Sequence, residues 1–178
     1  MAVALSFRAA VPADAAAVAG LVNSAYRGEG SKRGWTTEAD LLGGQRTDEE
    51  AVLEMIRAPG SRVELGFADG ALAACARLAR EDGGSCYVGM LTIDPARQGG
   101  GLGKELLARC EAVAREWGCA RTRMTVISRR AELIAFYERR GYRATGRVEP
   151  FPEGDPRFGL PKVRGLAFAE LVKPLAYS

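Results

Sequence analysis

The segment IDPARQGGGLGKELLARC, residues 93–110, joins the end of an apolar run to a helical pattern through three consecutive glycines. Residues 90–93 end the apolar run, and Asp94-Pro95 stops a strand there because proline cannot donate a hydrogen bond to a sheet. Gly118 ends the helical pattern. The segment therefore predicts a strand, a glycine loop and a helix, whose buried face holds Leu102, Leu106, Leu107, Cys110, Val113, Ala114 and Trp117.

The glycine loop predicts an anion-binding site. Glycines at the start of a helix leave backbone N–H groups unshielded, and these donors together with the helix dipole favour a phosphate or pyrophosphate. A GxxxxGK phosphate loop is excluded, because Gln98 stands in place of its first glycine and Glu105 in place of its hydroxyl residue. The dinucleotide fingerprint GxGxxG is excluded as well, since Lys104 or Leu106 would have to be glycine. The pattern that remains is QxxGxG, over residues 98–103.

This pattern resembles the pyrophosphate loop of the GNAT superfamily of N-acetyltransferases, which bind acetyl-CoA. A second stretch, RRAELIAFYERRGY, residues 129–142, is similar to the same family, in which a helix ends in a tyrosine, one or two charged residues and a Gly-aromatic step. One position departs from the family, which often has asparagine seven residues before that tyrosine, where this chain has Arg130. The residues that match are Tyr137, Glu138, Gly141 and Tyr142.

The resemblance implies an α/β fold (a mixed α+β sheet) that is largely antiparallel, flanked by helices and splayed open beside the central strand of residues 86–93. It implies a single GNAT-like domain over residues 1–178 and acetyl-CoA as the cofactor. The pyrophosphate is expected at the N–H groups of the glycine loop, and the pantetheine arm beside the last main-chain groups of the strand. The cofactor residues expected on this basis are Leu91, Thr92, Ile93, Gln98, Gly99, Gly100, Gly101, Leu102, Gly103, Lys104 and Arg130.

The reaction that the resemblance implies is acetyl transfer to the primary amine of a small molecule, by direct attack in a ternary complex. Tyr137 is the expected general acid for the leaving thiolate, and a backbone N–H of residues 91–93 is the expected oxyanion donor. The strand of residues 86–93 has no acidic residue, so the base stays open. The amine enters already deprotonated, or its proton passes through a water to Glu29, Glu38 or Asp40.

Two other functions remain open from the sequence. A non-catalytic acyl-CoA-binding or regulatory module would use the same loop. A nucleotide-binding or phosphosugar-binding enzyme would place its ligand at the same helix N-terminus. The arginine at position 130 and the unassigned base are compatible with the non-catalytic module.

Two stretches are expected to select the acceptor. Residues 26–47 mix aromatic and acidic side chains with glycines, and residues 149–165 hold four of the eight prolines, which indicates a long ordered loop. Phe151 and Phe158 of that loop would close over a substrate or fix the loop to the core. The acidic N-terminal third hints at a cationic amine. The substrate residues expected are Tyr26, Trp35 and Glu38.

Composition limits the remaining function classes. The 178 residues, 47% of them hydrophobic, suffice for one domain with a core, and a net charge of +3 does not demand nucleic acid. The chain has no histidine, so a Ser-His-Asp triad and a Cys-His pair are excluded, and no metal is expected. The four cysteines have no CxxC spacing and are expected to be core residues of a reducing compartment.

The charge is spread unevenly along the chain. Residues 1–70 carry seven Lys/Arg against ten Asp/Glu, whereas residues 109–147 carry ten Arg against four Glu. The basic half suits a polyanionic cofactor, or is an ordinary solvated face. The sequence predicts no signal peptide and no membrane helix, so we expect a cytoplasmic protein. We expect its partner to be a small molecule and expect it to bind neither nucleic acid nor a membrane. A homodimer is compatible with the sequence.

Local patterns predict the other elements. Capping boxes at Thr37 and Thr47 indicate two helices, the second ending near Pro59, and Asp69-Gly70 indicates a hairpin turn. Further helices are expected after Pro12 and over residues 130–140, and strands over residues 2–8, 63–67, 72–78, 122–127 and 166–172.

Overall fold

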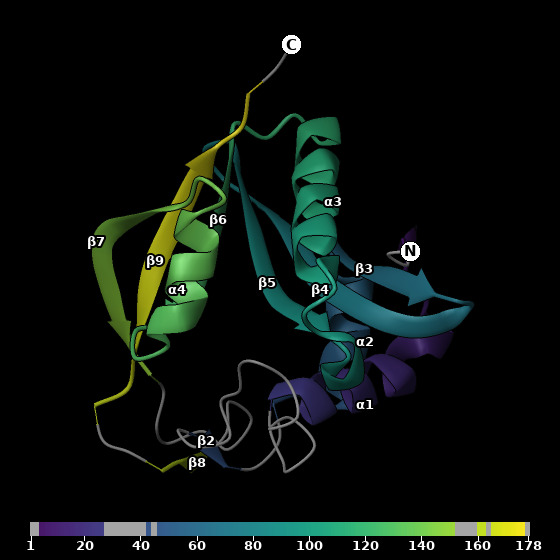
Figure 1. The fold of residues 1–178 in the computed structure, drawn as a ribbon. Helices are drawn as coiled ribbons and strands as arrows, with labels where there is room; N and C mark the ends of the chain where they lie inside the picture. Colours follow the sequence, from purple (N-terminus) through teal and green to yellow (C-terminus); the bar gives the residue numbers. More distant parts are fainter. Residues whose placement is uncertain (1–3, 27–41, 44–45, 152–159, 163–164, 177–178) are drawn as a thin grey trace.

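The computed structural model describes residues 4–26, 42–43, 46–151, 160–162 and 165–176. Within them, seven strands form one sheet in the order β1-β3-β4-β5-β6-β9-β7, and β2 pairs with β8 in a separate ribbon (Figure 1). The predicted fold class, a mixed sheet flanked by helices, is confirmed. The strands are β1 Ser6–Ala9, β2 Leu42–Gly43, β3 Ser61–Ala68, β4 Ala71–Glu81, β5 Ser85–Ile93, β6 Arg121–Ile127, β7 Arg143–Pro150, β8 Leu160–Pro161 and β9 Ala167–Pro174.

The pairing between β5 and β6 is parallel and short, whereas the other strand pairs of the sheet are antiparallel. The register runs from Ser85↔Arg121 to Tyr87↔Arg123 and stops there, although β5 continues to Ile93. Figure 1 shows the two strands diverging from this junction. The sheet is therefore splayed beside its central strand, and among the described residues the β6-facing edge of β5 beyond Tyr87 has no strand partner.

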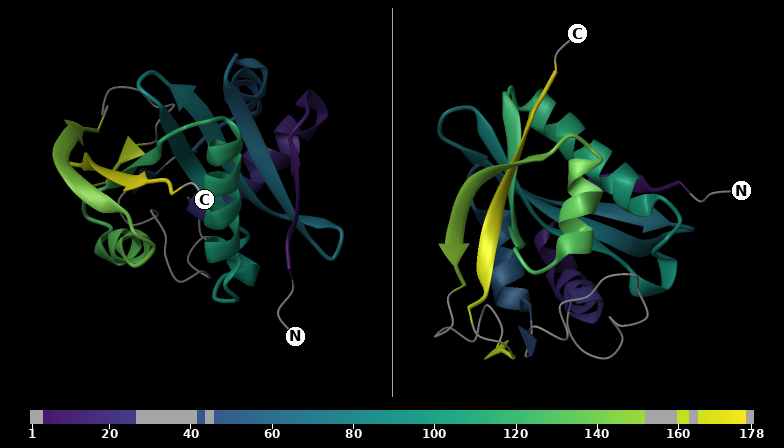
Figure 2. Two further views of the ribbon diagram at one scale, coloured as in Figure 1. Left: turned by 90° about the horizontal axis from the view of Figure 1, so that it is seen from above. Right: turned by 60° about the vertical axis from the view of Figure 1, so that its left-hand side comes forward.

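The helices cover both faces of the sheet. Because strand side chains alternate, Ala74 and Ala76 of β4 pack in one core cluster with α3, while Cys75 packs in another with α1 and α2. α4 packs with β6 and β9 on the α3 side (Figure 2). In the described part of the chain, no helix is long and apolar enough to cross a membrane. The helices are α1 Ala15–Tyr26, α2 Glu49–Arg57, α3 Leu102–Glu116 and α4 Ala131–Glu138, with short 3-10 turns η1 Pro12–Asp14 and η3 Pro95–Arg97.

Two predictions in the variable stretches were wrong. The expected loop of residues 149–165 begins inside β7 and contains β8. β7 was not predicted, because nearly all its side chains are exposed and it lacks the alternation that marks a half-buried strand. Leu42, expected to follow a helix cap, instead begins β2, and the capping box itself lies outside the described residues.

The α2 cap is one residue later than expected. The Asp48 carboxylate accepts the N–H of Ala51 at 2.7 Å, while Thr47 is buried. An aspartate at this position stabilises the helix because it satisfies an orphan N–H group and faces the positive end of the dipole.

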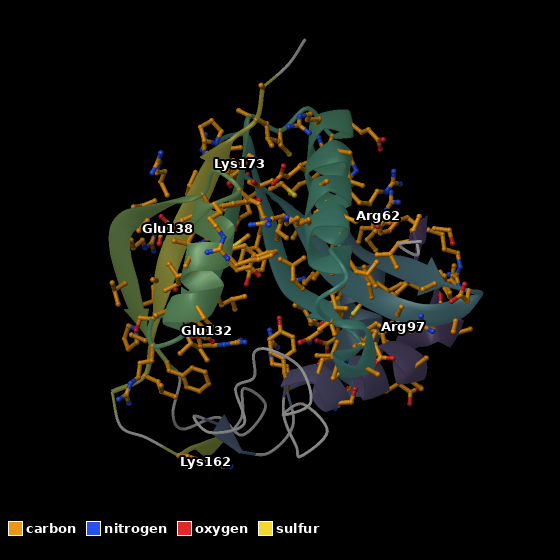
Figure 3. The ribbon with its side chains drawn as sticks, viewed as in Figure 1. Arg62, Arg97, Glu132, Glu138, Lys162 and Lys173 are labelled. Carbon is orange, nitrogen blue, oxygen red and sulfur yellow. The ribbon has the colours of Figure 1, made fainter. Side chains whose placement is uncertain are left out.

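Two acidic residues of α3 bond to partners that are distant in the sequence. Glu105 accepts the N–H of Leu5 at 2.8 Å. Glu111 is 6% exposed and accepts hydrogen bonds from the Tyr142 hydroxyl at 3.1 Å and the Lys173 ammonium at 2.8 Å. Lys173 lies on β9 (Figure 3), opposite Thr122 of β6, so this network joins α3 to the part of the sheet where β5 and β6 still pair.

We expect Glu111→Ala to lower the free energy of unfolding by about 2–4 kcal/mol, because it leaves the Lys173 ammonium and the Tyr142 hydroxyl without their buried acceptor. Urea unfolding followed by circular dichroism measures this change. Glu116→Ala, an exposed position on the same helix, is the matched control and should stay within about 0.5 kcal/mol of the parent. Equal effects of the two substitutions would contradict a structural role for the network.

Candidate functional site

The glycine loop joins the end of β5 to α3 in the conformation that its sequence requires. The Gln98 side-chain amide donates to the carbonyl of Ile93 at 3.2 Å and so ties the loop to the strand. Gly99 and Gly101 have φ angles of 91° and 82°, in the left-handed region that favours glycine. Gly101 is the N-cap of α3 and has no side chain to cap it, so the first N–H groups of the helix remain available to an anion.

A cavity of about 500 Å³ lies between this loop, the end of β5, α3 and α4, and we call it the loop cavity. Most of the expected cofactor residues line it. Leu102, the first residue of α3, does not line it, because it is 6% exposed and its side chain packs in the hydrophobic core. Gly100 does not line it either. The expected residues that do are Leu91, Thr92, Ile93, Gln98, Gly99, Gly101, Gly103 and Lys104.

α4 contributes residues to the loop cavity that the sequence analysis missed. Arg139 and Arg140 line it together with Phe136 and Leu133. The Arg140 guanidinium donates to the carbonyl of Phe136 at 2.9 Å and lies 4.0 Å from the centre of the Phe136 ring. Burial, and then the charge of Arg139, lowers the pKa of Arg140, an effect that an anion in the cavity would oppose. The excess of arginine in residues 109–147 was the signal for these two cations, but it did not single them out.

A second cavity, of about 300 Å³, lies where β5 and β6 diverge, and we call it the sheet cavity. It is bordered by the end of α1, by α2 and β4, and by the ends of β7 and β9. Aromatic rings form much of its wall, and four charged residues also line it. The aromatic residues are Tyr26, Tyr87, Tyr137, Phe151 and Phe168, and the charged residues are Arg46, Arg77, Arg130 and Glu149.

Three residues, Leu91, Leu133 and Tyr137, line both cavities and separate them. Tyr137 is 6% exposed, and its ring makes edge contacts with Phe136 and Tyr142 at centroid distances of 5.4 and 5.9 Å. Burial raises the pKa of its phenol, so the hydroxyl stays protonated. In the part of the chain that the structure describes, this hydroxyl has no hydrogen-bond partner, which leaves it available to a ligand at the junction.

A bulge in β5 shapes the junction. Arg77 pairs with Gly89 and Cys75 with Thr92, so Ala76 of β4 stands opposite two residues, Met90 and Leu91. Met90 has a φ of 53°, which is rare for a residue with a side chain and is often found at functional sites. The extra residue displaces the pairing at the point where Leu91 borders both cavities.

Side chains already bind two of the carbonyls expected to pair with a pantetheine arm. The Tyr26 hydroxyl donates to the carbonyl of Leu91 at 2.6 Å, and Gln98 occupies the carbonyl of Ile93. Each carbonyl has a second lone pair, and the free edge of β5 retains its N–H groups, so the expected pairing stays a prediction.

The structure places some of the other expected site residues. Tyr26 lines the sheet cavity, whereas Trp35 and Glu38, together with Glu29, Asp40 and Phe158, lie outside the described residues. Phe151 is 5% exposed and packs on Phe168 at a centroid distance of 5.4 Å.

Arg130, expected at the cofactor, lies on the other side of the junction. It is 5% exposed at the N-cap of α4 and lines the sheet cavity and a pocket of about 50 Å³ at the junction, but not the loop cavity. A contact between Arg130 and the cofactor therefore stays a prediction.

The cysteines take no part in either cavity. All four are buried free thiols, and burial raises the pKa of Cys75 and Cys86 to about 12, so these two carry no thiolate at neutral pH. This agrees with the expected core role. Among the described residues, no three His, Cys, Asp or Glu side chains are grouped so as to hold a metal ion.

Comparison with known proteins gives acetyltransferases among the relatives. The chain is 38% identical over 69 residues to blasticidin-S acetyltransferase of Streptomyces morookaense, a match that covers 38% of this chain and 49% of that protein. The fold is similar to that of yncA from Salmonella typhimurium, solved with its cofactor acetyl-CoA (TM-score 0.70, 23% identity, 98% and 96% of the two chains). It is also similar to that of nourseothricin acetyltransferase (TM-score 0.68, 20% identity, 97% and 99% of the chains).

The family model described as "Acetyltransferase (GNAT) family" matches residues 32–142, which is more than half of the chain. The expected enzyme class and the expected cofactor, acetyl-CoA, are thus confirmed at the level of the family. The glycine loop, the splayed strand and Tyr137 all belong to the matched residues, and the chain belongs to the acetyltransferase (GNAT) family.

Proposed function

We propose that this protein transfers an acetyl group from acetyl-CoA to the primary amine of a small molecule, by direct attack in a ternary complex. The observation that carries this proposal is that the loop cavity and the sheet cavity meet at Leu91, Leu133 and Tyr137. Two ligands that enter from opposite sides would bring their reacting groups together there, as a direct transfer requires.

The loop cavity fits the cofactor. A Cβ at Gly99 or Gly101 would meet open space, so the loop leaves room beside the uncapped N-terminus of α3. Lys104, Arg139 and Arg140 add positive charge for phosphate groups. When bound, acetyl-CoA supplies an activated acetyl thioester, and the loop itself performs no chemistry.

We propose that Tyr137 gives a proton to the leaving thiolate. Its raised pKa keeps the phenol protonated, and the buried surroundings that raise this pKa would also make a thiolate there more basic. The two effects act in the same direction, so a buried phenol remains a competent donor for a buried thiolate. The N–H groups of the β5 bulge are the candidate donors to the oxyanion.

Glu149 is the candidate for the general base. It is the acidic residue that lines the sheet cavity within the described residues, and it was not among the expected candidates. Its side chain is 47% exposed, so water reaches it, and it contacts Arg147 at 3.1 Å. We propose that it accepts the amine proton through water.

The relatives support a small acceptor. The names of blasticidin-S acetyltransferase and nourseothricin acetyltransferase indicate small-molecule acceptors for those proteins. A sheet cavity of about 300 Å³ is of the size that takes a small ligand.

Isothermal titration should show that the protein binds acetyl-CoA with a dissociation constant no weaker than about 100 µM. With an amine library that includes blasticidin S and nourseothricin, free CoA thiol should appear only when an amine is present. Binding without thiol release from any amine would favour the non-catalytic module. Preferential stabilisation by ATP or NAD over CoA would favour a nucleotide enzyme.

We expect Gly101→Glu to weaken acetyl-CoA binding by roughly a hundredfold or more, because it places bulk and negative charge at the N-terminus of α3. Gly118→Glu is a matched control at the other end of the same helix, where φ is 78° and a Cβ also meets open space. Both variants carry the same backbone strain, so only the first should lose binding in titration calorimetry. Equal losses would refute the assignment of the loop.

We expect Tyr137→Phe to retain acetyl-CoA binding and lower kcat roughly tenfold to a thousandfold, because the proton donor is removed. Tyr142→Phe is the opposite case: its hydroxyl bonds Thr122 at 2.8 Å and Glu111, so this variant should lose stability but little turnover. Steady-state kinetics and thermal unfolding of both variants separate the two roles. Normal turnover by Tyr137→Phe would show that the proton comes from elsewhere.

A further inference from the structure

The charges that line the sheet cavity are mostly positive. Arg46, Arg77 and Arg130 line it, against the single carboxylate of Glu149 in the described residues. Glu149 is itself paired with Arg147, so its charge offers little compensation to Arg46 and Arg77. These arginines are distinct from Arg139 and Arg140, which line the loop cavity.

Two partly buried arginines outside the cavity have carboxylate partners. Arg123 contacts Glu81 at 2.9 Å and Glu170 at 3.1 Å, and Arg62 contacts Glu64 at 2.7 Å. Arg46 and Arg77 have no such contact with any carboxylate in the described part of the chain. A cation in a concave site without a directly paired carboxylate is less well compensated than an ion-paired one, so an anionic ligand would stabilise the cavity.

Hydrogen bonds hold Arg46 at the cavity. The Asn23 side-chain oxygen accepts the N–H groups of Arg46 at 2.7 Å and Thr47 at 3.0 Å, and its amide donates to the Thr47 carbonyl at 3.0 Å. The segment before α2 is thereby fixed to α1. The backbone of Arg46 is therefore positioned by the fold, as a preorganised binding residue requires.

Two of the three arginines make cation–π contacts with the same aromatic ring, that of Tyr26. The guanidinium carbons of Arg46 and Arg130 lie 5.5 and 5.9 Å from the centre of the Tyr26 ring. The Tyr26 hydroxyl donates to Leu91, the residue that borders both cavities. Cation–π contacts orient two like charges at this ring, next to the place where an amine would have to react.

The third cation comes from the sheet. Arg77 lies on β4 opposite Gly89 and is partly buried, and its Nε atom is buried with no hydrogen-bond acceptor among the described residues. A planar guanidinium presents donors in a fork that matches the two oxygens of a carboxylate or phosphoryl group. An oxyanion would give this buried donor its missing acceptor.

We infer that the acceptor carries, besides its amine, an oxyanion group of carboxylate or phosphoryl type that Arg46, Arg77 and Arg130 bind in the sheet cavity. This inference rests on the proposed acetyl transfer and specifies its substrate class. It assigns Arg130 to the acceptor in place of the cofactor contact expected from the sequence. It replaces the cationic amine suggested by the acidic N-terminal third, whose Glu29, Glu38 and Asp40 lie outside the described residues. A purely cationic amine would meet repulsion from the three arginines.

Matched acceptors test the inference. The rate of CoA thiol release is measured for amino acids and for their carboxamides, which lack the carboxylate. It is also measured for 2-aminoethylphosphonate and for ethanolamine, which lacks the phosphonate. Each rate is corrected for the fraction of the amine that is unprotonated. We expect kcat/KM to be about tenfold to a hundredfold higher for the oxyanion member of at least one pair. The first set of pairs identifies a carboxylate and the second a phosphoryl group.

Variants link the preference to the arginines. Arg46→Gln and Arg77→Gln should each raise KM for the preferred acceptor roughly tenfold and reduce the preference over its uncharged partner, while kcat and KM for acetyl-CoA change little. Arg57→Gln, at an exposed position on α2, is the control of equal charge change and should keep the preference. Thermal unfolding should show that the cavity variants fold, since neither arginine has an ion pair to lose among the described residues.

The outcomes separate the two proposals. If uncharged or purely cationic amines are acetylated as well as the oxyanion members, the inference is wrong and the transferase proposal stands. If acetyl-CoA binds but neither these pairs nor the antibiotic library gives thiol release, both fail. An unchanged preference in Arg46→Gln and Arg77→Gln would also overturn the assignment to these residues.

Discussion

The parallel pairing of β5 and β6 ends after Tyr87 and Arg123, and the geometry of the site depends on this short junction. A strand that kept its partner to Ile93 would use its edge groups in the sheet and leave no space beside them. Because the strands diverge, one side of the gap opens to the glycine loop and the other to the sheet cavity. The same gap therefore offers a free strand edge and two approaches to it.

The junction has to be held firmly for the gap to keep its shape. The network of Glu111, Tyr142, Lys173 and Thr122 lies at the end of the sheet where β5 and β6 still pair, and it joins α3 to β6 and β9. Tyr142 also packs on Tyr137, so the ring of the candidate acid rests on the network that closes the sheet. The tyrosine of the stabilising network and the tyrosine proposed as the acid are therefore neighbours with separate tasks.

The two cavities are both positively charged but are built differently. The loop cavity combines main-chain N–H groups at a helix N-terminus with the cations of Lys104, Arg139 and Arg140. This combination suits a ligand with several phosphate groups. In the sheet cavity, three guanidinium groups stand among aromatic rings, two of them around Tyr26. That combination favours a ligand with a planar or tetrahedral oxyanion and an apolar body.

The sequence alone determined the order strand, glycine loop, helix, because periodicity and glycine conformation are local properties of the chain, and its resemblance to the family made Tyr137 the candidate acid. It did not reveal β7, whose exposed side chains leave no pattern, nor the partners of Glu105 and Glu111, which come from distant segments. Only the tertiary structure placed Arg46, Arg77 and Arg130 on one cavity and Arg139 and Arg140 on the other. The reason is physical: an arginine in a sequence shows its charge, whereas its partner, its burial and the ligand that it faces depend on which strands and helices pack around it.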